Sequence, residues 1–362
     1  MALTTVRPQG MGFNTGGRNL IKNGAMLVSQ RGTSFTSSST AYTLDRFQVL
    51  ENFGAAFTIT QSNTVPDEVQ FTKSLKMDCT TAATPSGTSE EFKLVYRMEG
   101  YDFLPSGYGN SYAKNLTLSF WVRSNLTGTY RINFMSRSGT NRNIGATYTI
   151  SSANTWEKKK ITFIPDTSVS PYQDHQDAFR IEWYLASSSD RTTGSVPTSW
   201  ATMDNATRAT GLNVNMASST DNEWYITGVQ LELGTNASDF EHRSYGEELA
   251  LCQRYFVRWG GTSAYERICH GQCIANNRAF YHLVFPQTMR AVGTLGRNGC
   301  AGGTSTAGAQ TFSSLTVDTN TDALHSTTLD GTVSGTPFTA GNVSELFANN
   351  STAHYIEIDA EL

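Results

Sequence analysis

Aromatic and planar polar side chains alternate with apolar ones in two segments of the chain. A sugar ring presents CH groups that pack on a flat aromatic face, and hydroxyls that hydrogen-bond to planar polar side chains. If both segments are strands of one sheet, five side chains would line a concave sugar-binding face: Trp121, Arg123, Arg180, Glu182 and Tyr184. The alternative is that a loop or a second subunit covers this face, as commonly happens to a single tryptophan on a strand.

Two short clusters contain side chains that bind metal ions. Cys269, His270 and Cys273 offer soft zinc ligands, but the sequence has no second CxxC or HxxxH pair, which favours core cysteines beside a surface histidine. The acidic segment 174–177 could hold calcium, but it lacks the glycine-centred spacing of an EF-hand loop, which favours a solvated loop. We therefore predict no metal site and no cofactor.

The sequence contains none of the local catalytic motifs for which we searched. These are the GxSxG elbow, HExxH, the P-loop and GxGxxG. Two carboxylates that meet in space need no fixed spacing, so acid pairs were also considered. Glu247 and Glu248 are better explained as the first turn of a helix, and the acidic residues of segment 357–361 as the solvent face of the last strand. We predict no catalytic residues and a protein that is not an enzyme.

Charge and hydropathy exclude several classes of partner. The net charge is -4, with 27 basic and 31 acidic residues, so no diffuse positive field attracts nucleic acid. No apolar run approaches the length that spans a bilayer, and residues 1–20 lack the apolar stretch of a signal peptide, which predicts synthesis in a cytoplasm and no membrane insertion. The 5 cysteines are too few for a disulfide framework and are expected to be thiols that mostly fill cores.

Short alternating runs, separated by clusters of Gly, Ser, Thr and Asn, predict an all-β protein. In residues 116–122 one phase is apolar and is expected to face inward: Leu116, Leu118, Phe120 and Val122. The phase slips by one residue around Gly228, which predicts a β-bulge. Residues 186–219 lack clean alternation and are expected to form long loops.

A helix is expected where two β regions meet. Ser244 and Glu247 have the spacing of a capping box. The apolar residues that follow recur at the spacing of one helical face and are expected to form a domain or oligomer interface: Tyr245, Leu249, Cys252 and Phe256. The predicted order is an extended attachment arm (1–18), a jelly-roll sandwich (19–243), a linking helix (244–256) and a smaller C-terminal β-sandwich domain (257–362).

Two stretches of the sequence resemble a known family. They are NLIKNGAMLVSQRG at Asn19 to Gly32 with YTLDRF at Tyr42 to Phe47, and GVQLELGTNASDFEHRSYGEELALCQRYF at Gly228 to Phe256. Together they resemble tail-fibre-like virion structural proteins of tailed bacteriophages, over roughly residues 19–256. The likeness implies that these stretches bracket a jelly roll similar to carbohydrate-binding modules, a fold that often carries a structural calcium ion.

The resemblance implies a protein of the virion surface, on the tail or the capsid exterior, that contacts other virion proteins and host surface polysaccharide. Such fibres are commonly homotrimers. The chain departs from long tail fibres because it has no heptad run, no collagen-like repeat and no large adaptor domain before Asn19. A capsid decoration, cement or head-fibre protein that stabilises the particle is therefore an alternative, and a glycan-degrading tailspike is a less favoured one.

Overall fold

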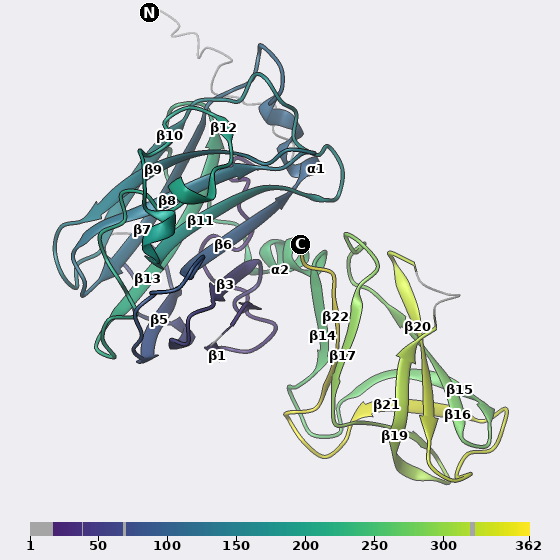
Figure 1. Ribbon diagram of the computed structural model, residues 1–362. Helices are drawn as coiled ribbons and strands as arrows, with labels where there is room; N and C mark the ends of the chain where they lie inside the picture. Colours follow the sequence, from purple (N-terminus) through teal and green to yellow (C-terminus); the bar gives the residue numbers. More distant parts are fainter. Residues whose placement is uncertain (1–16, 38, 68–69, 319–322) are drawn as a thin grey trace, which may run out of the picture. The chain divides into compact units, whose positions relative to one another are not determined.

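The computed structural model describes residues 17–37, 39–67, 70–318 and 323–362, and the chain divides into two compact units (Figure 1). One unit comprises residues 1–248 with Leu362, and the other comprises residues 249–361. Strands dominate both units, which confirms the all-β class. The predicted attachment arm lies, except for its last two residues, outside the described residues. None of the described helices is long and apolar enough to cross a membrane.

The larger unit is a sandwich of two antiparallel sheets. One is six-stranded, in the order β1-β4-β5-β13-β7-β10, and the other is seven-stranded, in the order β12-β9-β8-β11-β6-β3-β2. The strands are β1 (Ser34–Ser37), β2 (Ala41–Tyr42), β3 (Phe47–Glu51), β4 (Ala56–Ser62), β5 (Ser74–Thr81), β6 (Glu91–Glu99), β7 (Leu116–Ser124), β8 (Gly128–Ser136), β9 (Arg142–Ile150), β10 (Glu157–Phe163), β11 (Asp177–Ser187), β12 (Ala201–Thr202) and β13 (Glu223–Leu233). Short helical turns interrupt its loops: α1 (Gly100–Phe103), η2 (Leu104–Ser106), η3 (Ser189–Arg191) and η4 (Asn205–Thr207).

One apolar core fills the space between these sheets, because each strand turns alternate side chains inward. The predicted inward face of residues 116–122 is confirmed, since Leu116, Leu118, Phe120 and Val122 are fully buried. On β11 of the opposite sheet, Ile181 and Trp183 are fully buried and belong to the same core. Burial of each such side chain stabilises the fold by roughly 1.5–3 kcal/mol.

The predicted β-bulge is confirmed in β13. Its register against β7 shifts between Thr227 and Gln230. Gly228 lies in this gap with a φ of 60°, a left-handed conformation that favours glycine. The bulge therefore changes which residues of β13 face outward at the point where β13 passes Trp121.

The helix between the two β regions is α2 (Tyr245–Gln253). Its capping box is confirmed, because the backbone N–H of Ser244 donates to Glu247 Oε2 at 2.8 Å and the backbone N–H of Glu247 donates to Ser244 Oγ at 3.3 Å. The helix ends three residues earlier than expected, and Phe256 begins a strand. Tyr245 is 58% exposed, Leu249 is half-buried, and Cys252 and Phe256 are buried. Their interface role stays a prediction.

The smaller unit contains a closed barrel, in the order β15-β16-β20-β19-β18-β21, and a three-stranded sheet, β14-β22-β17. Its strands are β14 (Phe256–Gly260), β15 (Arg267–Ala275), β16 (Arg278–Val284), β17 (Thr294–Asn298), β18 (Cys300–Thr304), β19 (Gly308–Val317), β20 (Ser326–Val333), β21 (Val343–Ala348) and β22 (Tyr355–Asp359).

This barrel replaces the predicted C-terminal sandwich. Both architectures bury one face of each strand, so alternation alone does not distinguish them. The barrel interior is narrow, and glycines make room for its aromatic side chains. A Cβ atom at Gly302 would lie 2.9 Å from Cζ of Phe312, and one at Gly331 would lie 2.5 Å from Cε1 of the same ring.

Candidate functional site

The five residues predicted to bind sugar do not lie on one face. Trp121 and Arg123 belong to β7 of the six-stranded sheet, whereas Arg180, Glu182 and Tyr184 belong to β11 of the seven-stranded sheet. Each set projects away from the shared core, so the two sets lie on opposite outer faces of the sandwich. The single predicted face is therefore wrong, because alternation determines whether a side chain points inward or outward but not to which sheet its strand belongs.

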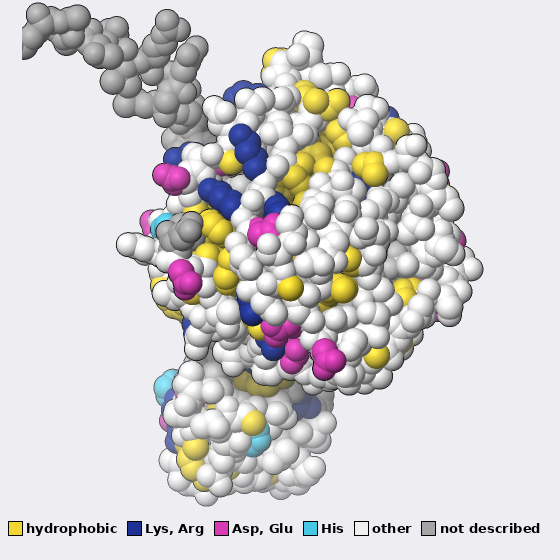
Figure 2. Space-filling model, turned by 90° about the vertical axis from the view of Figure 1, so that its left-hand side faces the viewer, with side chains coloured by type: hydrophobic (Ala, Val, Ile, Leu, Met, Phe, Trp, Pro, Cys, Tyr) yellow, Lys and Arg dark blue, Asp and Glu magenta, His cyan; other side chains and the backbone are white. Residues whose placement is uncertain are grey.

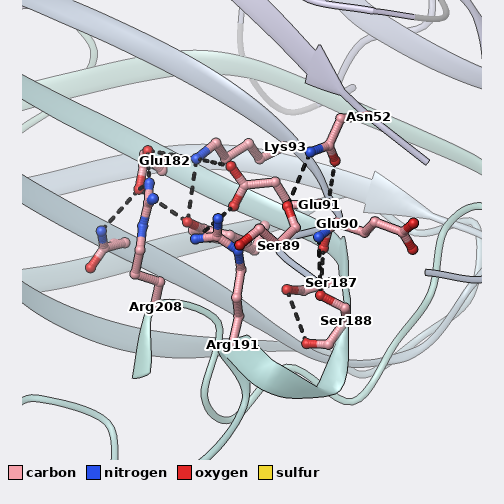
Figure 3. Close-up of polar contacts among 12 residues, drawn as sticks. Asn52, Ser89, Glu90, Glu91, Lys93, Glu182, Ser187, Ser188, Arg191 and Arg208 are labelled. Atoms are coloured by element: carbon pink, nitrogen blue, oxygen red, sulfur yellow. Dashed lines mark hydrogen bonds and ion pairs between the residues drawn. The ribbon is translucent and has the colours of Figure 1, made fainter. Parts of the chain in front are cut away.

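A loop covers the outer face of β11 at Glu182 (Figure 3). Arg208, which follows η4, donates from Nη2 to both carboxylate oxygens of Glu182 at 2.7 and 3.0 Å. Lys93 Nζ and Asn133 Nδ2 donate to the same carboxylate at 2.8 and 2.9 Å. The side chain of Glu182 is only 1% exposed. The alternative interpretation, that a loop covers these residues, is therefore the correct one for this face.

The charges of this network shift the pKa values of its members. Burial acts to raise the pKa of Glu182, but the charges of Lys93 and Arg208 outweigh it and hold the pKa well below its ordinary value. Burial raises the pKa of the neighbouring Tyr184 hydroxyl well above its ordinary value. Arg180 donates from Nε to Asp177 at 2.6 Å. All three predicted residues of β11 are therefore held by other side chains of the unit.

Arg123 is also engaged by its neighbours. Its Nη1 donates to Glu223 Oε1 at 3.1 Å, and its Nε donates to the carbonyl of Asn154 at 3.0 Å. Its guanidinium carbon also lies 4.8 Å from the centroid of the Tyr225 ring. Trp121, by contrast, is half-buried and lines an open cleft. Trp121 is therefore the predicted residue that lines this cleft.

This cleft, the Trp121 cleft, has a volume of about 240 Å³. It lies on the outer face of the six-stranded sheet, where β10, β7 and the bulge of β13 run side by side. Its lining residues are Gln70, Ser119, Trp121, Lys158, Gly228, Asp239, Phe240 and His242. Figure 2 shows one face of the larger unit, on which Lys and Arg side chains gather beside apolar ones.

Strand pairing and the bulge position the cleft's central side chains. Lys158 is the cross-strand partner of Trp121 on β10, and Thr227 is its partner on β13. A Cβ atom at Gly228 would lie 2.6 Å from Cζ of Phe71 and 3.1 Å from Cδ1 of Trp121. The absence of a side chain at the bulge therefore lets both rings approach the backbone.

An aromatic cluster that includes Phe240 and His242 forms another part of the cleft wall. The ring centroid of Phe71 lies 5.0 Å from that of Phe240 and 5.3 Å from that of His242. The segment that carries Phe240 is tied to β13, since the backbone N–H of Glu241 donates to Gln230 Oε1 at 2.8 Å and Gln230 Nε2 donates to the carbonyl of Asp239 at 3.2 Å. The wall is therefore held in place without a ligand.

The cleft combines aromatic rings with polar side chains that exchange hydrogen bonds with hydroxyls. Trp121, Phe240 and His242 offer ring faces for CH groups, while Gln70, Asp239 and Lys158 offer donors and acceptors. The site residues expected from the sequence did not include the segment of Asp239 to His242. The available signal was a pair of aromatic residues, Phe240 and His242, in the segment that follows the bulged strand.

In the described part of the chain, no three His, Cys, Asp or Glu side chains are grouped to hold a metal ion, and this includes the segments 269–273 and 174–177. Cys273 points into the barrel and is buried, and burial raises the pKa of the half-buried Cys269 thiol to about 12. His270 is exposed, with Nε2 3.6 Å from Glu345 Oε1. Asp177 is bound by arginines rather than solvated.

Fold and site together define an all-β protein whose larger unit is a two-sheet sandwich with an open aromatic cleft. Among solved structures, a putative sugar binding protein from Bacteroides thetaiotaomicron is similar at 12% identity and a TM-score of 0.35, over 60% of this chain and 100% of that chain. A family 11 carbohydrate-binding module from Clostridium thermocellum is similar at 11% identity and a TM-score of 0.28, over 57% of this chain and 99% of that chain.

A phage protein is also among the similar structures. The enzymatically active domain of bacteriophage CBA120 tailspike protein 4 is similar at 14% identity and a TM-score of 0.30, over 59% of this chain and 21% of that chain, so the match spans about a fifth of its length. No family model matches the sequence, and no curated protein matches it. Identities and TM-scores this low carry no argument about function.

Proposed function

We propose that this chain is a surface component of a bacteriophage particle that binds host surface glycan, and that the Trp121 cleft holds one sugar residue. The observation that carries the proposal is the position of Trp121, which is half-buried in an open cleft that Phe240 and His242 also line, with Lys158 as its cross-strand partner. Such a combination of rings and polar side chains suits the two kinds of surface that a pyranose presents.

The placement on a phage particle rests on the sequence resemblance of residues 19–47 and 228–256 to tail-fibre-like virion proteins. The second of these stretches contains Asp239, Phe240 and His242, which line the cleft. The resemblance therefore includes residues of the proposed site. In this proposal the chain acts as a homotrimer and binds glycan without cleaving it.

The test is binding of the purified full-length chain to an array of bacterial surface polysaccharides. Trp121→Ala should weaken binding to the recognised glycan by at least about tenfold, because the central ring face is lost. Tyr265→Ala is the matched control, since Tyr265 is an exposed aromatic residue of the smaller unit and should leave binding unchanged. No binding across the array, or equal binding by the Trp121 variant, would refute the proposed site.

Three further measurements separate this function from its alternatives. Release of reducing ends from a bound polysaccharide would indicate a degrading spike. Dense, regular copies on the capsid shell, without glycan binding, would indicate a decoration protein. A stable monomer by mass measurement in solution would exclude the trimer.

A further inference from the structure

A second pocket, of about 140 Å³, lies in the larger unit between two loops. One loop joins β6 to β7 and contains α1 and η2, and the other joins β10 to β11. Figure 1 shows α1 at one end of the sandwich. Its lining includes Gly100, Gly107, Asn110, Tyr112, Tyr172 and Gln173. None of these residues contributes to the Trp121 cleft.

Backbone hydrogen bonds hold the two loops together. The backbone N–H of Gly100 donates to the carbonyl of Gln176 at 3.2 Å, and the N–H of Tyr101 donates to the carbonyl of Asp174 at 3.0 Å. The N–H of Gly109 donates to the carbonyl of Asp166 at 2.8 Å. A Cβ atom at Gly100 would overlap the carbonyl of Tyr172, so only glycine allows this approach. The pocket is therefore formed before any ligand arrives, which reduces the entropic cost of binding.

One aromatic ring of this pocket is backed by glycine and open to solvent. A Cβ atom at Gly107 would lie 2.9 Å from both Cδ2 and Cε2 of Tyr112, so this edge of the ring lies against the Gly107 backbone. Gly107 has a φ of 69°, which disfavours other residues there. Tyr112 is nevertheless 72% exposed. A ring that is held along one edge and is otherwise largely exposed offers a flat surface on which a sugar can stack.

The polar groups around this ring are neutral. Asn110 and Gln173 carry amides, and Ser106 and Tyr172 carry hydroxyls, whereas no charged side chain is among the described residues that line the pocket. Asn110 Nδ2 donates to the carbonyl of Gly107 at 3.2 Å, which fixes the plane of its amide beside Tyr112. The Trp121 cleft, in contrast, includes Lys158 and Asp239. The second pocket thus favours an uncharged ligand that exchanges hydrogen bonds.

We propose that this pocket is a second saccharide site, which binds a neutral hexose residue stacked on Tyr112. The proposal shares the ligand class of the proposed function but none of its residues. Two sites on one unit allow a polysaccharide to be held at two points, and the second contact then forms at a high effective concentration.

The test is saturation-transfer NMR from the full-length chain to methyl β-D-glucoside, methyl β-D-galactoside and methyl α-D-mannoside. We expect transfer to at least one of these, and in a Trp121→Ala background, which removes any binding in the Trp121 cleft, Tyr112→Ala should reduce the remaining affinity about tenfold. Tyr101→Ala is the matched control, because Tyr101 is 54% exposed in the same loop and does not line the pocket. Thermal unfolding of the variants checks that the fold is retained.

Two outcomes would overturn the second site. One is no transfer to any of the three glycosides, and the other is transfer to the Trp121→Ala variant that the added Tyr112→Ala change leaves unchanged. Neither affects the proposed function, which fails instead when array binding does not depend on Trp121.

Discussion

A Cβ atom on Gly228 would lie 3.1 Å from Cδ1 of Trp121, so the bulge of β13 and the indole of β7 occupy adjoining space. The residue that interrupts one strand therefore decides how close the central aromatic ring of the cleft lies to the sheet. Phe71, on the other side of Gly228, is subject to the same constraint.

Replacement of Gly228 should therefore impair both the fold and the cleft. Gly228→Ala places a side chain at a φ of 60° and against two rings, and we expect the free energy of unfolding to fall by about 1–3 kcal/mol. Urea unfolding followed by tryptophan fluorescence measures this, because every tryptophan except Trp259 lies in the larger unit.

The matched control for that change is Gly54→Ala. Gly54 also has a positive φ, of 83°, but nothing lies within 4 Å of a Cβ atom there. The Gly54→Ala variant should lose some stability through backbone strain but should bind glycan as the wild type does. Equal losses of glycan binding in the two variants would contradict a specific role for the bulge.

The buried network around Glu182 should contribute strongly to stability. Glu182→Gln leaves Lys93 and Arg208 without the carboxylate that faces both, and breaking a buried ion pair costs about 3–5 kcal/mol. Urea unfolding of the larger unit is the measurement. Lys73→Ala, which removes only an exposed hydrogen bond to Asn63, should change stability by less than about 0.5 kcal/mol. Similar midpoints for the two variants would show that the network is not structurally important.

Stability should also fall in acid because of Asp177. Burial acts to raise the pKa of Asp177, but Arg180, Arg97 and Arg137 outweigh it and hold the pKa below its ordinary value. A carboxylate with a lowered folded-state pKa binds fewer protons than in the unfolded chain. The stability that Asp177 contributes is therefore fully present above its unfolded-state pKa of about 3.9, and it is lost as the pH falls through its folded-state pKa.

Urea midpoints of the wild type and Asp177→Asn, measured from pH 7 to pH 2, test this contribution. The variant should be less stable at pH 7, and its midpoint should decline less steeply below about pH 4. Parallel curves for the two proteins would assign the acid sensitivity to other carboxylates.

The cysteines of the barrel should react slowly as long as the smaller unit is folded. Burial raises the pKa of the Cys269 and Cys300 thiols to about 12, so little thiolate is present at pH 8. Alkylation by iodoacetamide, followed by mass spectrometry, should be slow in buffer and complete in urea. A cysteine introduced by Ser305→Cys in an exposed turn should react at least about 100-fold faster. Rapid native alkylation of Cys300 would mean that the barrel opens readily.

Features that depend on neighbouring residues were predicted from the sequence. Alternation identified the buried face of residues 116–122, a one-residue slip identified the bulge at Gly228, and the spacing of Ser244 and Glu247 identified the cap of α2. Each is a local relationship, because side-chain direction in a strand repeats every two residues and a cap joins residues three apart.

Only the tertiary structure decided which strands share a sheet and what covers them. Trp121 and Glu182 both point outward, yet they lie in different sheets, and a loop that carries Arg208 covers Glu182. The cleft joins Gln70 and Phe240 to Trp121, although these residues are far apart in the sequence. Pairing between distant strands and the path of a long loop depend on the free energy of the whole unit. Local periodicity therefore determined the inward and outward faces, and long-range packing determined the site.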